Sequence, residues 1–312
     1  MQPLEVASTL LNAMAALFIM MGLGFLLVRL KLLKSSDSRA LSLVLIYLIG
    51  PAVVLRAFSI DFTPEVRDGF LLALGAALVI HVLLFGIAWL YGKAIRLTPV
   101  EKASVMYSNA GNLIIPLVSV VLDDSYVIYS SAFICVQLFF IWTHGQIMIS
   151  GEKQIPWKKI LLNPNLLACV VGMGMLLLHI KLPPLLSNVC GQLSGTMGPV
   201  CMIMIGMLLA EVPWKQILTS GRTWLVMALK MVGTPLLILL FLKLTHAADL
   251  VPDGGKILYI SFMAVMTPAA TTVTQLAQMY RQEAEYSSAI NVLTTLICIL
   301  TMPVMTWLYW LL

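Results

Sequence analysis

The sequence predicts an all-α integral membrane protein with ten transmembrane helices, arranged as two inverted repeats of five helices. Three observations carry this prediction. Hydrophobic residues make up 60% of the 312 residues and charged residues only 11%, whereas about 25% of a typical soluble domain is charged. Polar loops divide the chain into ten apolar segments. In each half, the fourth segment is interrupted by polar residues and a proline.

The apolar segments approach the length that a bilayer requires, which is about 20 helical residues for a core of about 30 Å. The mean hydropathy of the chain is +0.97. The predicted spans are residues 6–28, 39–58, 67–91, 101–122, 126–149, 163–180, 184–210, 222–244, 256–279 and 284–311. The first Lys or Arg is Arg29, so the first span lacks the basic leader of a cleaved signal peptide and is expected to be a retained helix.

The distribution of Lys and Arg predicts the orientation of these spans. With the N-terminus outside, thirteen of the basic residues fall in cytoplasmic loops and five in outer loops. This bias fits the positive-inside rule and places both termini on the non-cytoplasmic side of the cell inner (plasma) membrane. The basic residues therefore report topology, and no nucleic-acid partner is expected.

The midpoint of the chain indicates an inverted repeat. A polar cytoplasmic linker, residues 151–162, separates a first five-helix repeat, residues 1–150, from a second, residues 163–312. Because five is an odd number, two copies of the same unit must cross the membrane in opposite directions.

The two interrupted spans indicate a binding site. Pro116 and Pro268 lie 152 positions apart. Asparagines lie close to the first proline and threonines close to the second. Broken membrane helices need protein or a wet cavity around them. Each break also exposes the N-terminus of a half-helix, whose free N–H groups attract an anion. A simple proline kink is the alternative interpretation.

Several residues near the breaks are candidate substrate ligands. They are Asn109, Gly111, Asn112, Gln137, Thr267 and Thr271, together with the two prolines. Amides in hydrocarbon can instead bond neighbouring helices, and threonine can bond its own backbone. These alternatives stay open for Gln137 and the threonines, and helix bonding is favoured for Asn291.

Two ionisable residues lie inside predicted spans, at matched positions of the third and eighth. Lys230 could neutralise an anionic substrate or helix carbonyls, or could extend to the cytoplasmic surface. His81 could couple proton movement, although a structural role is favoured.

Signatures of other functions are absent from the sequence. It contains no HExxH, GxSxG, P-loop or CxxC motif, so we expect neither an enzyme nor a bound cofactor or metal. The five cysteines lie mostly in apolar runs and are expected to be packing residues without disulfides.

The run Asn109-Ala-Gly111-Asn112-Leu-Ile-Ile-Pro116-Leu117 resembles the fourth span of the auxin efflux carrier family, which includes bacterial organic-acid permeases. Ile114 replaces the usual second glycine of that motif. Later matches follow in the same order, namely Val136-Gln137, Lys230 before Pro235, Pro268 with Gln275-Leu-Ala-Gln278, and Leu293-Thr294-Thr295. Together they cover essentially the whole chain.

The resemblance implies a fold, a mechanism and a cargo. Helices 1, 2, 6 and 7 would form a dimeric scaffold, and helices 3–5 and 8–10 a mobile transport domain. Helices 4 and 9 would cross at Pro116 and Pro268. A small mono- or dicarboxylate such as malate or malonate would be carried by elevator-like secondary active transport. The alternatives are a sodium- or proton-coupled carrier of another solute, auxin-like or bile-acid-like, on the same fold, and a membrane ligand sensor.

Overall fold

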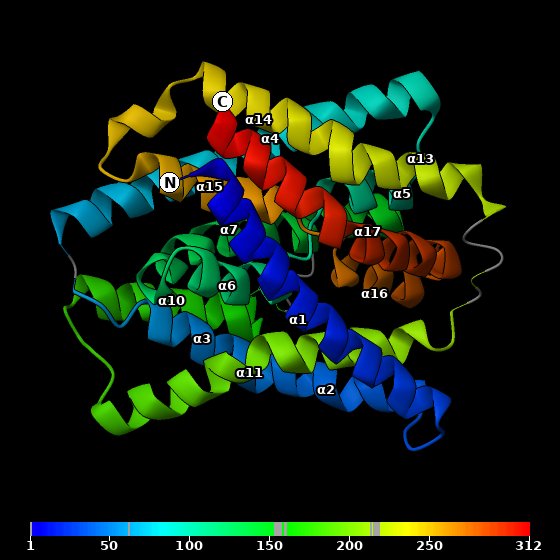
Figure 1. Cartoon of the computed structure of the whole chain (residues 1–312), viewed down its shortest axis with the longest axis horizontal. Helices are drawn as coiled ribbons and strands as arrows, with labels where there is room; N and C mark the ends of the chain where they lie inside the picture. Colours follow the sequence, from blue (N-terminus) through cyan, green and yellow to red (C-terminus); the bar gives the residue numbers. More distant parts are fainter. Residues whose placement is uncertain (1, 62, 153–157, 159–160, 213, 215–218) are drawn as a thin grey trace.

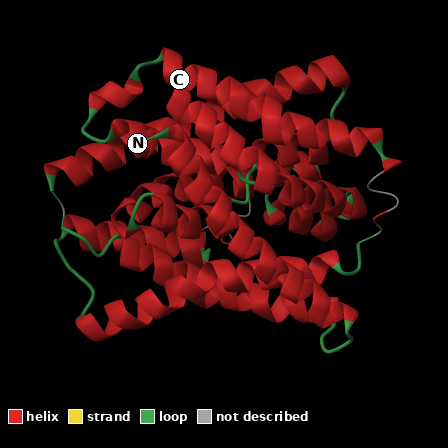
Figure 2. Ribbon diagram, in the orientation of Figure 1, coloured by secondary structure: helices red, strands yellow, loops and turns green. Residues whose placement is uncertain are grey.

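The computed structural model describes residues 2–61, 63–152, 158, 161–212, 214 and 219–312. This described part is almost entirely helical and contains no strand beyond one isolated bridge (Figure 2). Seven segments within it are helical, long and apolar enough to cross a membrane. Three shorter apolar helices, Ala110–Val121, Pro164–Leu177 and Gly254–Met266, fall in the fourth, sixth and ninth predicted spans. The ten-span inverted repeat itself stays a prediction.

The elements of the first half follow the predicted spans closely (Figure 1). They are α1 (Pro3–Arg29), η1 (Ser35–Asp37), α2 (Ser38–Val44), η2 (Leu45–Ile49), α3 (Gly50–Ala57), α4 (Pro64–Ile95), α5 (Pro99–Met106), α6 (Ala110–Val121), η3 (Asp124–Tyr126), α7 (Val127–Phe140), η4 (Ile141–Gly145) and α8 (Gln146–Ser150). The short π-helical turns η2 and η4 continue the helices on either side of them.

The elements of the second half follow in the same manner. They are α10 (Pro164–Leu177), α11 (Pro184–Leu209), α13 (Gly221–Ala228), η5 (Leu229–Gly233), α14 (Thr234–Leu244), η6 (Ala247–Leu250), α15 (Gly254–Met266), α16 (Thr271–Met279) and α17 (Ala284–Leu311). Most of the predicted linker, residues 153–157 and 159–160, lies outside the described residues, as does Lys215.

Local capping signals set where several helices begin. In Thr63-Pro64, Thr98-Pro99 and Asn163-Pro164, the first side chain accepts a hydrogen bond from a backbone N–H of the first turn. Proline fits the first helical position because that position has no intrahelical bond to donate. Glu101 completes a capping box with Thr98. These pairs fix the starts of α4, α5 and α10.

Helix α1 crosses the face of the molecule and lies against α11 and α17 (Figure 1). Two glycines allow the crossing with α11. A Cβ at Gly24 would overlap the backbone of Ile203, and a Cβ at Gly206 would overlap the carbonyl of Met21. Small residues at such contacts let membrane helices approach closely and gain van der Waals packing.

Both interrupted spans are broken in the structure, but the first break does not lie at Pro116. Helix α5 ends at Met106 and α6 begins at Ala110, whereas Pro116 lies inside α6. A proline costs one helical hydrogen bond, and membrane helices tolerate this when neighbours cover the site. Gly198 of α11 lies against the Pro116 ring. The second break, between Met266 and Thr271, does contain Pro268.

The expectation that no cysteine forms a disulfide is also wrong. Cys135 of α7 and Cys169 of α10 form a disulfide. Both positions are apolar helix surfaces, as the sequence indicates, but these two surfaces pack against each other and bring the sulfur atoms together. Cys201 and Cys298 are buried free thiols. The disulfide therefore ties the fifth predicted span to the sixth.

Candidate functional site

The two breaks meet in the interior as short extended segments. Ser108 and Ala269 form an antiparallel bridge. The backbone N–H of Asn109 donates to the carbonyl of Pro268 at 2.8 Å, and the N–H of Ala270 donates to the carbonyl of Tyr107 at 3.0 Å. The crossover is thus formed by residues 107–109 and 268–270. Pairing two extended segments satisfies backbone groups that neither helix nor water would reach.

Side chains from two neighbouring helices bond the outer edges of this crossover. Gln137 of α7 accepts from the N–H of Ser108 at 3.1 Å and donates to its carbonyl at 2.7 Å. In α17, Thr294 Oγ1 accepts from the N–H of Ala269 at 3.2 Å, and Asn291 Nδ2 donates to its carbonyl at 2.6 Å. The same function is therefore served once in each half of the chain, by the fifth and the tenth predicted spans.

Helices α6 and α16 both start at the crossover without a side-chain cap. Asn112 Nδ2 donates to Asn109 Oδ1 at 3.0 Å, which orients the Asn109 amide. Asn109 is 4% exposed, and its Nδ2 has no hydrogen-bond partner among the described residues. A buried amide donor without a partner is rare and costly. Two uncapped helix starts and one unpaired amide are suited to binding an anion.

A cavity of about 610 Å³ opens beside these helix starts. Helix segments from both halves line it, including α3, α7 and α11. Its lining includes five of the predicted substrate ligands: Asn109, Gly111, Asn112, Gln137 and Thr271. Most of the remaining lining is apolar, as is usual for small-molecule sites. A Cβ at Gly111 would meet no atom within 4 Å, so this glycine faces open space.

The other three predicted ligands do not line the cavity among the described residues. Thr267 is fully buried and donates to the carbonyl of Ala264 at 2.8 Å, within its own helix. Pro268 contributes its carbonyl to the crossover. Pro116 packs against Gly198. Thr267 and Pro268 therefore belong to the framework of the crossover, and Pro116 to the packing between helices.

Lys230 lies behind the crossover and does not reach the surface. Its side chain is 0% exposed, which excludes extension to the cytoplasmic side. Nζ donates to Ser108 Oγ at 2.6 Å and to the carbonyl of Val265 at 3.4 Å. Val265 belongs to the last turn of α15, where the helix dipole is negative. Among the described residues no carboxylate pairs with this lysine.

His81 lies apart from the cavity, in the middle of α4. Its Nδ1 is 2.7 Å from the carbonyl of Ala77, and its ring packs against Phe133 and Phe140 at centroid distances of 4.9 and 5.4 Å. The Nε2 atom has no partner within the described part of the chain. The contacts favour the structural interpretation of this histidine.

Sequence reasoning missed several residues of the site. Ser108, which receives the Lys230 and Gln137 bonds, was not distinguished from its neighbours. Asn165 lines the cavity at the start of α10, where Gly50 leaves room for its amide. The pattern Asn163-Pro164-Asn165 was a signal for a helix start, but it did not indicate which way that start faces. Thr294 belongs to the Leu293-Thr294-Thr295 run of the family resemblance, but that resemblance assigned it no function.

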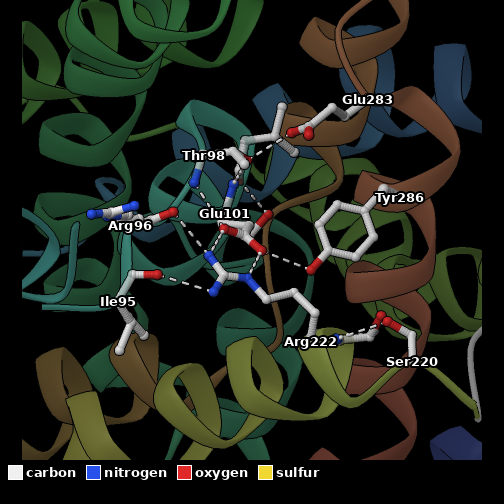
Figure 3. A network of polar contacts seen from close by, with 11 residues as sticks. Ile95, Arg96, Thr98, Glu101, Ser220, Arg222, Glu283 and Tyr286 are labelled. Atoms are coloured by element: carbon white, nitrogen blue, oxygen red, sulfur yellow. Dashed lines mark hydrogen bonds and ion pairs between the residues drawn. The ribbon is translucent and has the colours of Figure 1, made fainter. Parts of the chain in front are cut away.

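A second polar cluster joins helix ends away from the cavity (Figure 3). Arg222, at the start of α13, binds both carboxylate oxygens of Glu101 at 2.6 Å. It also donates to the carbonyls of Ile95 and Arg96 at 3.0 Å. The hydroxyl of Tyr286 donates to Glu101 at 2.8 Å. This bidentate pair connects α4, α5, α13 and α17, with the Glu101 side chain 1% exposed and the Arg222 side chain 38% exposed.

The described residues contain a related cluster at the start of α15. Tyr126 donates from its hydroxyl to Asp253 at 3.0 Å, and Lys256 pairs with the same carboxylate at 2.8 Å. The lysine and the tyrosine hydroxyl lower the pKa of Asp253, which lies just outside the helix. In both clusters a tyrosine near the start of the last span of one repeat bonds an acid near the start of the fourth span of the other repeat.

Comparisons with known proteins place the chain among membrane transport proteins. The family model described as "Membrane transport protein" matches residues 9–156 and 152–306. A protein of Rhizobium meliloti (strain 1021), named "Putative malonate transporter", is 25% identical over 296 residues, which cover 89% of each chain.

Proposed function

The chain belongs to the auxin efflux carrier family of membrane transport proteins, and we propose that it is a secondary active transporter of small organic anions, with malonate as the first candidate. It is a multi-pass membrane transporter and not an enzyme. The observation that carries the proposal is the cavity at the crossover, which Asn109, Asn112 and Thr271 line beside two uncapped helix starts. The named relative adds malonate as a specific cargo.

The proposed mechanism is elevator-like alternating access. In this scheme α1 to α3, α10 and α11 are the scaffold, and α4 to α8 with α13 to α17 are the transport domain. The cavity supports it because its lining comes from both groups: Gly50, Asn165 and Met204 belong to the first, and Asn109 and Thr271 to the second. A bound carboxylate would then move with the crossover while the scaffold stays in place.

The proposed architecture is a ten-span inverted repeat. Three matched features support it: the breaks at residues 107–109 and 267–270, the edge bonds from Gln137 and from Asn291 with Thr294, and the tyrosine–carboxylate clusters. The first two features occur once within each half. Each cluster joins a tyrosine of one half to an acid at the matched place in the other half. We further propose an inner-membrane location with both termini outside, and a homodimer formed through the scaffold.

Lys158 supports an inward-facing state within this proposal. It lines the cavity and belongs to the predicted cytoplasmic linker. A lysine at the mouth would raise the local concentration of anions. Lys230, behind the crossover, would supply a positive charge near the cavity when its amine is protonated. No role in ion coupling is assigned to His81, because its contacts are to α4 itself and to two phenylalanines.

Uptake of labelled malonate by proteoliposomes tests the proposal, with imposed pH, sodium and malonate gradients applied in turn. Accumulation above protein-free liposomes is the expected result, and the active gradient identifies the coupling ion. A carboxylate panel measures selectivity. Binding of malonate without uptake under every gradient would favour a ligand sensor instead. Absence of both binding and uptake across the panel would overturn the organic-anion assignment.

The substitution Asn109→Asp tests the anion site. It replaces the free amide donor with a carboxylate, which repels a bound anion, so we expect malonate uptake to fall by at least about tenfold. Asn163→Asp is the matched control. It adds the same charge near the same cavity, but an aspartate still caps α10. Equal losses in both variants would mean that the general field, and not a contact at Asn109, sets the uptake rate.

A further inference from the structure

Two side chains of α17 hold the second extended segment of the crossover without reaching the cavity. Thr294 and Asn291 bond the N–H and the carbonyl of Ala269. Thr294 is 0% exposed, Asn291 is 8% exposed, and neither is among the described residues that line the cavity. A change at either position can therefore reach a ligand only through the backbone of Ala269.

That backbone leads directly into the site. Ala269 precedes Ala270, which is the N-cap of α16 and donates across the crossover to Tyr107. The next residues, Thr271 and Thr272, line the cavity. The direction of the first N–H groups of α16 thus depends on how Ala269 is held. The backbone of Ala269 is bonded by α17, and its neighbours Pro268 and Ala270 are bonded by the first break.

We infer that Thr294 and Asn291 are positioning residues for the substrate site, which fix Ala269 and thereby aim the uncapped start of α16 at a bound carboxylate. This inference rests on the proposed function, since it takes the anion at the crossover as the ligand. In a membrane interior a released backbone group finds no water, so it pulls the segment toward other partners. A preorganised donor that turns away binds its anion less tightly.

The contrast with Gln137 explains why α17 gives the cleaner experiment. Gln137 bonds both backbone groups of Ser108, but it also lines the cavity. A substitution there would mix lost positioning with lost substrate contact. Thr294 and Asn291 divide the same task between two buried side chains and touch only backbone at the crossover. Their substitution therefore isolates the positioning effect.

The first measurement is the concentration dependence of malonate uptake by full-length protein in proteoliposomes. Thr294→Val keeps the shape of the side chain and removes the acceptor, and we expect the KM for malonate to rise about tenfold. The maximal rate should change by less than about twofold, because positioning acts on binding. Thr294→Ser restores the hydroxyl and should restore the KM.

Thr295→Val is the matched control. Thr295 is equally buried in the same helix, but its hydroxyl bonds the carbonyl of Asn291 and no other described residue. This variant should keep the wild-type KM. An equal rise in KM for Thr295→Val and Thr294→Val would show that any buried threonine of α17 has this effect, and the positioning role would be lost.

Hydrogen exchange provides a second measurement that needs no substrate. In Thr294→Val, peptides covering residues 266–272 should exchange at least about tenfold faster than in wild type, whereas Thr295→Val should not change them. Asn291→Ala removes the other bond to Ala269 and should act in the same direction, so it replaces Thr294→Val if that variant does not accumulate. Wild-type exchange in both variants would overturn the inference. If wild-type protein does not transport malonate, that result contradicts only the proposed cargo. The hydrogen-exchange measurement still tests whether Thr294 and Asn291 position Ala269.

Discussion

The polar residues at the crossover serve two different purposes. One group forms hydrogen bonds to the backbone of the two extended segments, and it consists of Gln137, Asn291 and Thr294. Asn109 keeps one amide donor unpaired, and Asn112 fixes the direction of that amide. Residue type alone does not separate the two groups, because both contain amides in apolar surroundings. The distinction follows from which backbone groups the breaks leave unsatisfied.

Lys230 brings an amino group into contact with the crossover and with the end of α15. Its ammonium donates to Ser108 and to a carbonyl in the last turn of α15. We expect Lys230→Met to reduce malonate affinity by at least about tenfold, because an unpaired hydroxyl and helix end are left buried and the positive charge behind the anion site is lost. The concentration dependence of malonate uptake measures this.

The control for this substitution lies in the same predicted span. Lys243→Met removes a lysine that lies over the ring of Tyr309, 4.3 Å from its centroid, near the outer end of α14. Uptake by this variant should stay close to wild type. Unchanged malonate affinity in Lys230→Met would contradict a contribution of the buried charge to the site.

At the scale of elements, hydropathy predicted the helices well, because a membrane span must satisfy its backbone internally and must be about 20 residues long. The position of the first break was not predictable in the same way. Pro116 was the visible signal, yet α6 passes through it, and the chain opens at residues 107–109. That choice depends on hydrogen bonds to residues 268–270, which are distant in the sequence. The Cys135–Cys169 pair was missed for the same reason.

The Arg222–Glu101 pair joins elements that the sequence keeps far apart. Isosteric Glu101→Gln removes the carboxylate and leaves the guanidinium without its charge partner. Because the Arg222 side chain is 38% exposed and stays partly solvated, we expect an apparent loss of stability of about 1–2 kcal/mol. The melting temperature of purified protein, with Arg67→Gln as control, measures this. Within the described part of the chain Arg67 pairs with exposed Asp68 alone, at the start of α4, and its loss should have little effect. Equal melting temperatures for Glu101→Gln and wild type would contradict a structural role for the cluster.

At the scale of the whole molecule, the cavity lies between two groups of helices that the proposed mechanism moves past each other. The disulfide crosses this same boundary, because Cys135 lies in α7 of the proposed transport domain and Cys169 in α10 of the proposed scaffold. A disulfide between the scaffold and the transport domain would hold the protein in one of the two end states of the elevator movement. If the elevator scheme is correct, formation of this disulfide should therefore block transport.

Protein with the Cys135–Cys169 pair oxidised should bind malonate but not turn over, and dithiothreitol before reconstitution should restore uptake. Oxidation by a hydroperoxide forms the sulfur–sulfur bond with loss of two protons and two electrons, and peptide mass analysis without reduction measures its extent. The Cys135→Ser and Cys169→Ser double variant should transport under both conditions. Full uptake by fully oxidised protein would mean that α7 and α10 keep their contact throughout the cycle. In that case the moving boundary lies elsewhere, and the division of the helices into scaffold and transport domain is wrong.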